Sequence, residues 1–253
     1  MNVKYDFHIH TALSPCALEE MSPNNIVNMA IISGLDAIAV TDHNSGRNVE
    51  AVLNVSEETD LIVLPGMEVE SKEEIHVVCL FSDLDCVYNM QTFVYSNLPK
   101  MKNRSKVLGK QLLFNEEDEV IGEEEQLLSF ATSIPFDVLI QKTWELGGIA
   151  IPAHIDRPSY SVISNLGILP SNLDLSCLEI SQYADYAKYR TKYYQYLLLQ
   201  SSDAHELGHI GICQREFMLN NLDCELLDNV EKKDYHILLR KKIIQFLRNA
   251  PNC

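Results

Sequence analysis

Two histidines separated by a single residue lie close to the start of the chain, in the sequence His8-Ile9-His10. Residues 3–9 alternate loosely and are rich in β-formers, which predicts a strand that ends at this pair. Because successive side chains of a strand point to opposite faces, both imidazoles lie on the same side. Two imidazoles placed in this way can share one metal ion. Such pairs also occur by chance, so the hypothesis depends on further ligands elsewhere in the chain.

More imidazoles and carboxylates lie at the ends of other apolar runs. They are His43, Glu68, His76, His154, Asp203 and His205. The carboxyl ends of the strands form the active-site face of α/β barrels, so these side chains are expected to meet. Imidazoles and carboxylates together bind zinc, manganese or iron. The alternative is a set of capping or core histidines, which explains their repeated place at strand ends less well.

The elements that must position these side chains alternate between strands and helices. Apolar runs predict strands over residues 3–9, 36–41, 61–64, 75–81, 149–154, 175–181 and 197–202, with a short final strand within 210–219. Helices are predicted around 23–34, 47–56, 136–146, 183–196 and 235–248. This alternation predicts a mostly parallel α/β fold, and the number of strands favours a closed or nearly closed barrel. The link between Glu68 and His76 is too short for a helix and predicts a hairpin.

One segment, residues 83–133, interrupts this rhythm. It is polar and mixed, and basic residues between Lys100 and Lys110 precede an acidic run from Glu116 to Glu125. We interpret it as a small inserted helical cap subdomain over the strand ends of one barrel domain, formed by residues 1–82 and 134–253. A solvated surface excursion is an equally good interpretation of so charged a segment.

Composition narrows the classes of function. The 253 residues suit one barrel-sized domain, and the net charge of −16 disfavours binding to long nucleic acid. A small anionic substrate is compatible with this charge, because bound divalent metals reverse the field locally. No apolar run reaches the roughly 18 residues of a membrane helix, and no signal-peptide core follows Met1. The seven scattered cysteines include no Cys-x-x-Cys pair, so we expect a reducing cytoplasm, no membrane association and no evident protein partner.

Five short motifs, taken in order, resemble those of the PHP family, named for the polymerase and histidinol phosphatase domains. They are His8-Ile9-His10, Thr41-Asp42-His43, Gly66-Met67-Glu68 with His76, Pro152-Ala153-His154 and Ser202-Asp203-Ala204-His205. Each is short, but the ordered set spans residues 6–205 and is highly specific. The resemblance implies a distorted (β/α)7 barrel that hydrolyses phosphoesters with two or three divalent metal ions, manganese, iron or zinc.

The resemblance also implies how these residues divide among the metals. The implied groups are His8, His10 and Asp203 for one metal; His76 and His154, with Glu68 as a bridge, for a second; and His43 and His205 for a third. A hydroxide shared by two of the metals would attack phosphorus, and the ions would neutralise the phosphoryl oxygens and the leaving alkoxide.

One position departs from the family pattern. Many members have an Asp that helps to bind the third metal where this chain has Pro15, which carries no donor. Glu20 could fill the vacant position, and Glu19 less readily. Cys16 is a third possibility, and its thiolate would favour zinc. The alternative is that these residues form loop surface and that the third metal is weak or absent.

Three further polar residues are candidates for catalysis. Asp42 would orient His43 or a bound water, although a simple turn residue is the alternative. Arg157 follows His154 closely in the sequence and would grip a phosphate, with a surface ion pair as the alternative. His209 would reach the rim of the site as a general acid for the leaving group, although a loop histidine is the simpler interpretation.

We therefore expect a metal-dependent phosphoesterase that acts on a small phosphorylated metabolite or a nucleotide. Tyrosines such as Tyr160, Tyr183 and Tyr186 would stack on a base or sugar, although aromatic packing is the simpler expectation for them. The alternatives are a histidinol-phosphate-type phosphatase and a non-catalytic metal-binding PHP module. A nearly complete set of ligand positions favours an enzyme over the module.

Overall fold

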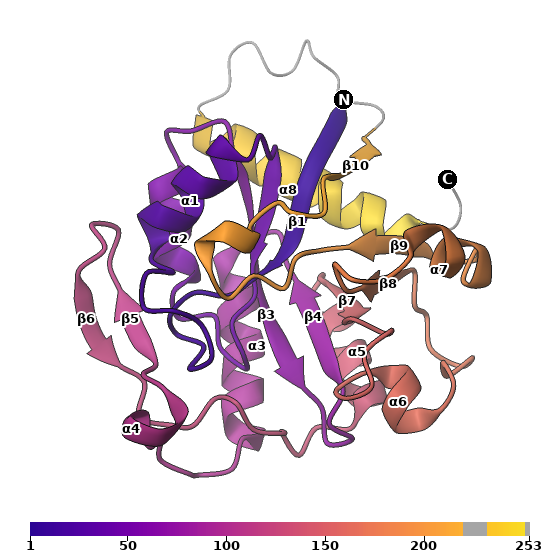
Figure 1. Cartoon of the computed structure of the whole chain (residues 1–253), viewed down its shortest axis with the longest axis horizontal. Coiled ribbons are helices and arrows are strands. Elements are labelled where there is room, and N and C mark those ends of the chain that lie inside the picture. The colour runs from indigo at the N-terminus through magenta and orange to yellow at the C-terminus, as the bar shows by residue number, and fades with distance from the viewer. Residues whose placement is uncertain (220–231, 251–253) are drawn as a thin grey trace.

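A computed structural model describes residues 1–219 and 232–250. Its first half is a parallel βαβαβ unit of β1 (Asn2–Ile9), α1 (Pro23–Ile32), β2 (Ala37–Val40), α2 (Val49–Ser56) and β3 (Ile62–Glu70). β2 pairs in parallel with both β1 and β3, so the carboxyl ends of the three strands lie at the same end of the sheet (Figure 1). The two helices contact each other and pack their apolar faces on the sheet. The predicted strands and helices of this half are confirmed.

The rest of the main sheet is antiparallel. β4 (His76–Leu80) forms the predicted hairpin with β3, and β7 (Ile149–Pro152) pairs with β4 at one edge. β10 (Arg215–Met218) pairs with β1 at the other edge, which gives the strand order β10-β1-β2-β3-β4-β7. Three of the five described strand pairs in this sheet are antiparallel, whereas the sequence predicts a mostly parallel sheet.

A second, two-stranded parallel sheet ends in the segment that carries Asp203 and His205 and places this segment beside the end of β1. β8 (Cys177–Ile180) and β9 (Leu197–Gln200) pair with each other, and β8 packs beside β7. Short helices α6 (Val162–Leu166) and α7 (Tyr186–Lys192) and the 3-10 turn η1 (Leu207–His209) connect this region. A single β-bridge between Ile9 and Ala204 joins the segment after β9 to the end of β1. The sheet is therefore curled into a distorted, incompletely closed barrel, and the predicted α/β fold class is confirmed.

The segment 83–133 differs from the predicted helical cap. It contains α3 (Leu84–Asn97), the single turn α4 (Ser105–Leu108) and an antiparallel hairpin of β5 (Leu112–Phe114) and β6 (Val120–Glu123). α3 buries Val87, Met90 and Val94 against the main sheet, as a barrel helix does. The prediction of a helical cap omits this hairpin, because short alternating strands in a charged segment carry too weak a pattern to be recognised, and a cap over the strand ends stays a prediction.

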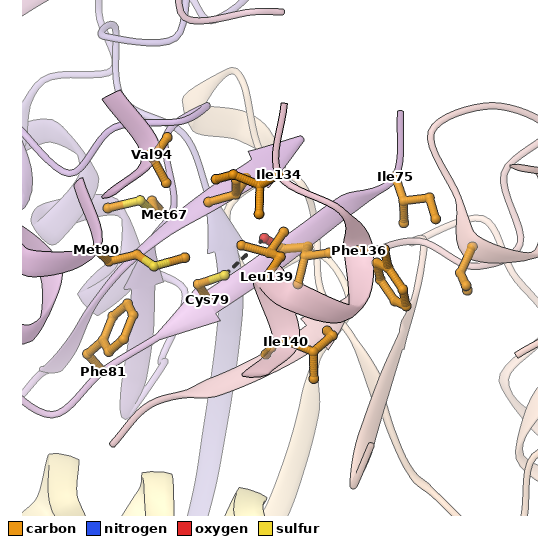
Figure 2. Packing of buried hydrophobic residues seen from close by; sticks show 14 of the residues in the cluster. Met67, Ile75, Cys79, Phe81, Met90, Val94, Ile134, Phe136, Leu139 and Ile140 are labelled. Atoms are coloured by element: carbon orange, nitrogen blue, oxygen red, sulfur yellow. Dashed lines mark hydrogen bonds between the residues drawn. The ribbon is translucent and has the colours of Figure 1, made fainter. Parts of the chain in front are cut away.

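Apolar clusters pack against different faces of the curled sheet. Figure 2 shows one of them, in which Met67 and Cys79 of the β3–β4 hairpin meet Leu139 of α5 (Phe136–Glu145). On another face α8 (Lys232–Asn249) packs Leu239 and Ile243 against β1, β3 and β7. The predicted C-terminal helix is thus confirmed. None of the helices in the described ranges is long and apolar enough to span a membrane.

Candidate metal centre

Glu68 stands at the centre of a group of imidazoles. It lies on β3 between Met67 and Val69, which point outward into the apolar cluster, so alternation turns its carboxylate inward. Only 1% of the residue is exposed. Five imidazoles come within 2.9–3.6 Å of its two oxygens, and they belong to His8, His10, His43, His76 and His154. One buried carboxylate therefore contacts five histidines from four separate segments of the chain.

The first predicted metal group is assembled in the structure. His8 and His10 end β1, and the Nε2 atoms of both lie 3.3 and 3.1 Å from Oδ1 of Asp203. One donor atom from each of the three residues lies within 4.8 Å of the other two, a spacing that could hold one ion. The backbone bridge between Ile9 and Ala204 explains why residues so far apart in sequence meet.

His43 joins two further groups, which divides the ligands differently from the implied arrangement. It lies within ligand distance of Glu68 and His76 in one group, and of His10 and His205 in another. A β-bridge between His43 and Glu68 places the ends of β2 and β3 side by side and so fixes the first of these contacts. His154 is also in the cluster, with Nε2 3.3 Å from Oε1 of Glu68.

Several buried donor atoms of the cluster have no hydrogen-bond partner among the described residues. They are Nε2 of His8, Oε2 of Glu68 and both ring nitrogens of His154. Nearly all buried polar groups in proteins are hydrogen-bonded, so each exception requires an explanation such as a bound ion. Imidazole nitrogens and carboxylate oxygens facing one small space are a donor set for divalent zinc, manganese or iron. The residues present thus fit such ions.

The electrostatics of the cluster keep its two carboxylates ionised and His10 neutral, the states in which these three residues bind metals. Burial would raise the pKa of Glu68, but His76 and His8 outweigh it and hold that pKa well below its usual value. The pKa of Asp203 is likewise held well below its usual value, because His8 and His10 outweigh its burial. Burial, together with positive His205 and His43, lowers the pKa of His10 well below its usual value. The carboxylates are therefore ionised, and His10 is neutral.

The loop after His10 contains the three residues that could replace the usual Asp ligand. Glu20 is exposed on the surface, and Glu19 forms an ion pair of 2.9 Å with Lys110. The residue that reaches the cluster is Cys16, whose Sγ lies 3.1 Å from Nε2 of His205. Glu20 thus lies on the surface in this structure, and its role as a ligand stays a prediction.

A model of the PHP domain matches residues 6–236 of the chain. The chain belongs to the PHP family. Its fold is similar to that of the lesion-specific endonuclease Q from Pyrococcus furiosus, with a TM-score of 0.64 and 20% identity over 92% of this chain and 56% of that one. The chain thus spans about half the length of endonuclease Q.

Two other solved structures are similar to this PHP domain over nearly their whole length. One is described as a metal-dependent phosphoesterase from Bifidobacterium adolescentis, with a TM-score of 0.55 and 18% identity over 93% of this chain and 96% of that one. The other is an amidohydrolase from Chromobacterium violaceum, with a TM-score of 0.58 and 15% identity over 85% and 91%. Identities this low show a shared fold alone. No curated protein matches the chain.

Glu179, which the sequence analysis did not identify, is a buried carboxylate that contacts the metal-ligand histidines. Glu179 of β8 is 2% exposed, and its Oε1 lies 2.8 Å from Nδ1 of His8. The same oxygen accepts a hydrogen bond of 3.3 Å from the backbone N–H of His154. It therefore orients one ligand and ties the strand ends together. The signal that could have found it is a charged residue within the otherwise apolar run Cys177-Leu178-Glu179-Ile180.

We expect Glu179→Ala to weaken metal binding or activity by about 10–100-fold, the range for groups that orient ligands. The replacement leaves Nδ1 of His8 without the acceptor that fixes its ring. Titration calorimetry with zinc would measure the effect, and Glu179→Gln, which retains an oxygen acceptor, should lose less. Equal affinities for the wild type and the Ala variant would contradict this role.

Asp42 is a positioning residue behind the metal ligands. Its oxygens accept hydrogen bonds from the backbone and hydroxyl of Thr11 and from Oγ of Ser14, at 2.7–2.8 Å. Ser14 Oγ also lies 2.9 Å from Nδ1 of His10. Asp42 therefore supports His10 through Ser14. Both of its oxygens bond to the β1–α1 loop, and its orientation of His43 or a bound water stays a prediction.

Backbone strain marks the same centre. Four residues in or beside it have positive φ without being glycine: Asn44 (50°), His154 (32°), Tyr160 (55°) and Asp203 (53°). Such conformations cost roughly 1–3 kcal/mol each and persist where the surrounding structure over-determines them. The strained positions include two ligand candidates, so the fold sets the ligand directions at some cost in stability.

The other predicted catalytic residues lie at different distances from the centre. Nη1 of Arg157 lies 2.7 Å from Oδ2 of Asp203, so its guanidinium borders the metal cluster and is 35% exposed. His209 instead pairs with Glu206 at 2.9 Å on the exposed turn η1. Its role as a general acid stays a prediction. Tyr186 packs under the guanidinium of Arg215, as expected of an aromatic residue in packing contact.

Proposed function

We propose that this PHP protein is a metal-dependent phosphoesterase that hydrolyses a phosphate ester of a small metabolite or nucleotide. The observation that carries the proposal is Glu68, a buried carboxylate within 3.6 Å of five imidazoles and adjacent to the Asp203 group. A donor set of this kind can hold more than one ion, and paired ions suit phosphoryl transfer to water. The family membership supports the same reaction class.

The protein's own residues prepare the site for this chemistry. Bound divalent ions would supply an activated water and neutralise the charge of the phosphoryl oxygens. Glu68 and Asp203 provide ionised oxygens, and their side chains are only 1% and 7% exposed, which limits the access of competing solvent. Glu179 and the Asp42–Ser14 pair fix the rings of His8 and His10 from behind. The substrate phosphate is held from the exposed side.

Arg157 is the residue that we assign to the substrate phosphate. Its guanidinium is partly exposed and anchored to Asp203 by one nitrogen, which leaves its other N–H groups available for a phosphate. A hydrogen bond from a charged donor contributes about 1.5–3 kcal/mol. The anchoring contact keeps the donor next to the ligand cluster, where a phosphoryl oxygen would lie.

We expect Arg157→Ala to raise KM by about 10–100-fold, which corresponds to that free energy. Arg157→Lys should recover only part of the loss, because an ammonium does not form the two-pronged contact. Arg190→Ala on the surface of α7 is a matched control that should behave as the wild type. Steady-state kinetics that show no change in KM or kcat for Arg157→Ala would contradict the assignment.

Tyr160 favours a nucleotide among the small substrates. Its ring lies over that of His76, with centroids 4.8 Å apart and planes 30° apart, and the residue is 46% exposed. Its backbone is held in place by the hydrogen bond from the N–H of His76 to its carbonyl. An exposed aromatic ring fixed against a ligand histidine can stack on a base or sugar beside the scissile phosphate.

Endonuclease Q has been solved with a duplex that carries an abasic lesion, so a lesioned DNA end is a second candidate substrate. The net charge of −16 argues against it, because a negative surface repels a long polyanion. The test is a panel of nucleotides, phosphomonoesters, histidinol phosphate and an abasic duplex, with manganese, iron or zinc. Turnover of the duplex alone would overturn the small-substrate proposal, and no turnover at all would support a non-catalytic metal-binding module.

We propose a cytoplasmic location, as the cysteine pattern predicts. The five described cysteines, Cys16, Cys79, Cys86, Cys177 and Cys213, are free thiols. Free thiols persist in reducing compartments.

A further inference from the structure

The loop 14–18 contacts the outer histidines of the metal centre at several points. Ser14 accepts a hydrogen bond from the backbone N–H of His43 at 3.1 Å and lies 2.9 Å from Nδ1 of His10. The N–H of Leu18 donates to the carbonyl of His205 at 2.9 Å. The loop therefore contacts His10, His43 and His205, the three histidines of one candidate metal group, which we call the outer group.

Cys16 lies between these anchors. Its Sγ is 3.1 Å from Nε2 of His205, and the imidazole of His43 is near enough to help lower the pKa of the thiol. Donor nitrogens of His10, His43 and His205 lie within 4.8 Å of one another. Beside them, the buried Oε2 of Glu68 lies 2.9 Å from Nδ1 of His43 and lacks a hydrogen bond of good geometry. The sulfur of Cys16 thus lies beside three imidazoles whose nitrogens already have the spacing of a metal site.

A second contact fixes the loop from outside. Gly109, which begins the link from α4 to β5, has a φ of +98° and lies against the carbonyl of Pro15. Any side chain at position 109 would collide with that carbonyl, so only glycine permits the approach. Leu112 then donates its N–H to the carbonyl of Ala12 at 2.8 Å. The segment 109–112 therefore holds the thiol loop against the centre.

We infer that Cys16 is a metal ligand and that, with His43 and His205, it forms a zinc-selective position at the outer edge of the centre. Thiolates are soft ligands that favour zinc, whereas carboxylates also suit manganese. The inner donors, Glu68 and Asp203 with their histidines, are hard or borderline and accept either ion. The centre therefore combines one zinc position with inner positions of lower selectivity. This inference rests on the metal binding of the proposed function but not on its reaction.

The test compares the wild type with Cys16→Ser, Cys16→Asp and the control Cys86→Ser, a half-buried thiol on α3. Each protein is stripped of metal, checked for folding by circular dichroism, and reconstituted with cobalt. Wild type and Cys86→Ser should show the near-ultraviolet charge-transfer absorption of a thiolate–cobalt bond, and both Cys16 variants should lack it. The same absorption in a folded Cys16→Ser protein would overturn the inference.

Metal analysis after dialysis against mixed zinc and manganese provides a second readout. Loss of the thiolate should weaken zinc retention at one site by at least about tenfold, since even outer-shell changes cost about 10–100-fold. Cys16→Asp should accept manganese at that site. Equal zinc content in the wild type and Cys16→Ser would count against the inference. Neither readout requires turnover. A protein that hydrolyses nothing in the substrate panel could therefore still bind zinc through Cys16, and an active phosphoesterase could lack a zinc ligand at Cys16.

Discussion

Glu68→Gln should reduce phosphoesterase activity by about 10³-fold or more. An ion that polarises a phosphoryl group contributes several kcal/mol, and each 1.4 kcal/mol is a factor of about ten in rate. Glu68 is the carboxylate that contacts five imidazoles, so its charge serves more than one metal group. The amide keeps the size of the side chain but removes that charge. Steady-state kinetics together with elemental analysis would separate lost metal from lost turnover.

The matched control for this variant is Glu216→Gln on β10, an exposed position at the edge strand of the same sheet. It removes the same charge far from the cluster and should retain wild-type activity and metal content. A Glu68→Gln protein with normal metal content and normal turnover would show that this carboxylate does not hold the catalytic ions. A folded variant that has lost both metal and activity supports the assigned role.

Most of the inner site could be predicted because it depends on regular strands. Alternation places His8 and His10 on one face of β1, and the short link after Glu68 permits only a hairpin that returns His76 to it. The positions of Asp203 and His205 follow once their strand lies beside β1. Local periodicity and the order of short motifs carry this information, and the structure groups these residues as ligand candidates.

The outer part of the site was not predictable from local pattern, since its geometry comes from contacts between distant segments. Which of Glu19, Glu20 and Cys16 faces His205 depends on a turn braced by Gly109, about ninety residues later in the sequence. The role of Glu179 depends on the close approach of β8 to β1, which no periodicity specifies. The β5–β6 hairpin was missed for a similar reason, because its buried residues Leu112 and Phe114 complete a core formed by α1 and α2.

Removal of the metals should lower the melting temperature of the protein by roughly 8–16 °C. A ligand that binds only the folded state at 1,000 times its Kd contributes about 4 kcal/mol, and a chain of this size shifts by about 2–4 °C per kcal/mol. The physical cause is the buried cluster itself. Without ions, Nε2 of His8, Oε2 of Glu68 and the ring nitrogens of His154 remain buried without hydrogen bonds. Differential scanning calorimetry of chelated and zinc-loaded protein would measure the shift at one fixed pH above 7, where unperturbed imidazoles are neutral and available to metal.

Two variants make this result specific to the cluster. Glu68→Gln should show a much smaller difference between loaded and metal-free protein, because the ions lose their shared carboxylate. His209→Ala should keep the full difference, since His209 pairs with Glu206 on an exposed turn. A melting temperature that does not respond to chelation in the wild type would mean that the orphaned donors are not filled by metal. The same loss in Glu68→Gln as in the wild type would mean that the stabilising ion binds elsewhere. If only the wild type and His209→Ala respond, the stabilising ions bind at the cluster that Glu68 holds together.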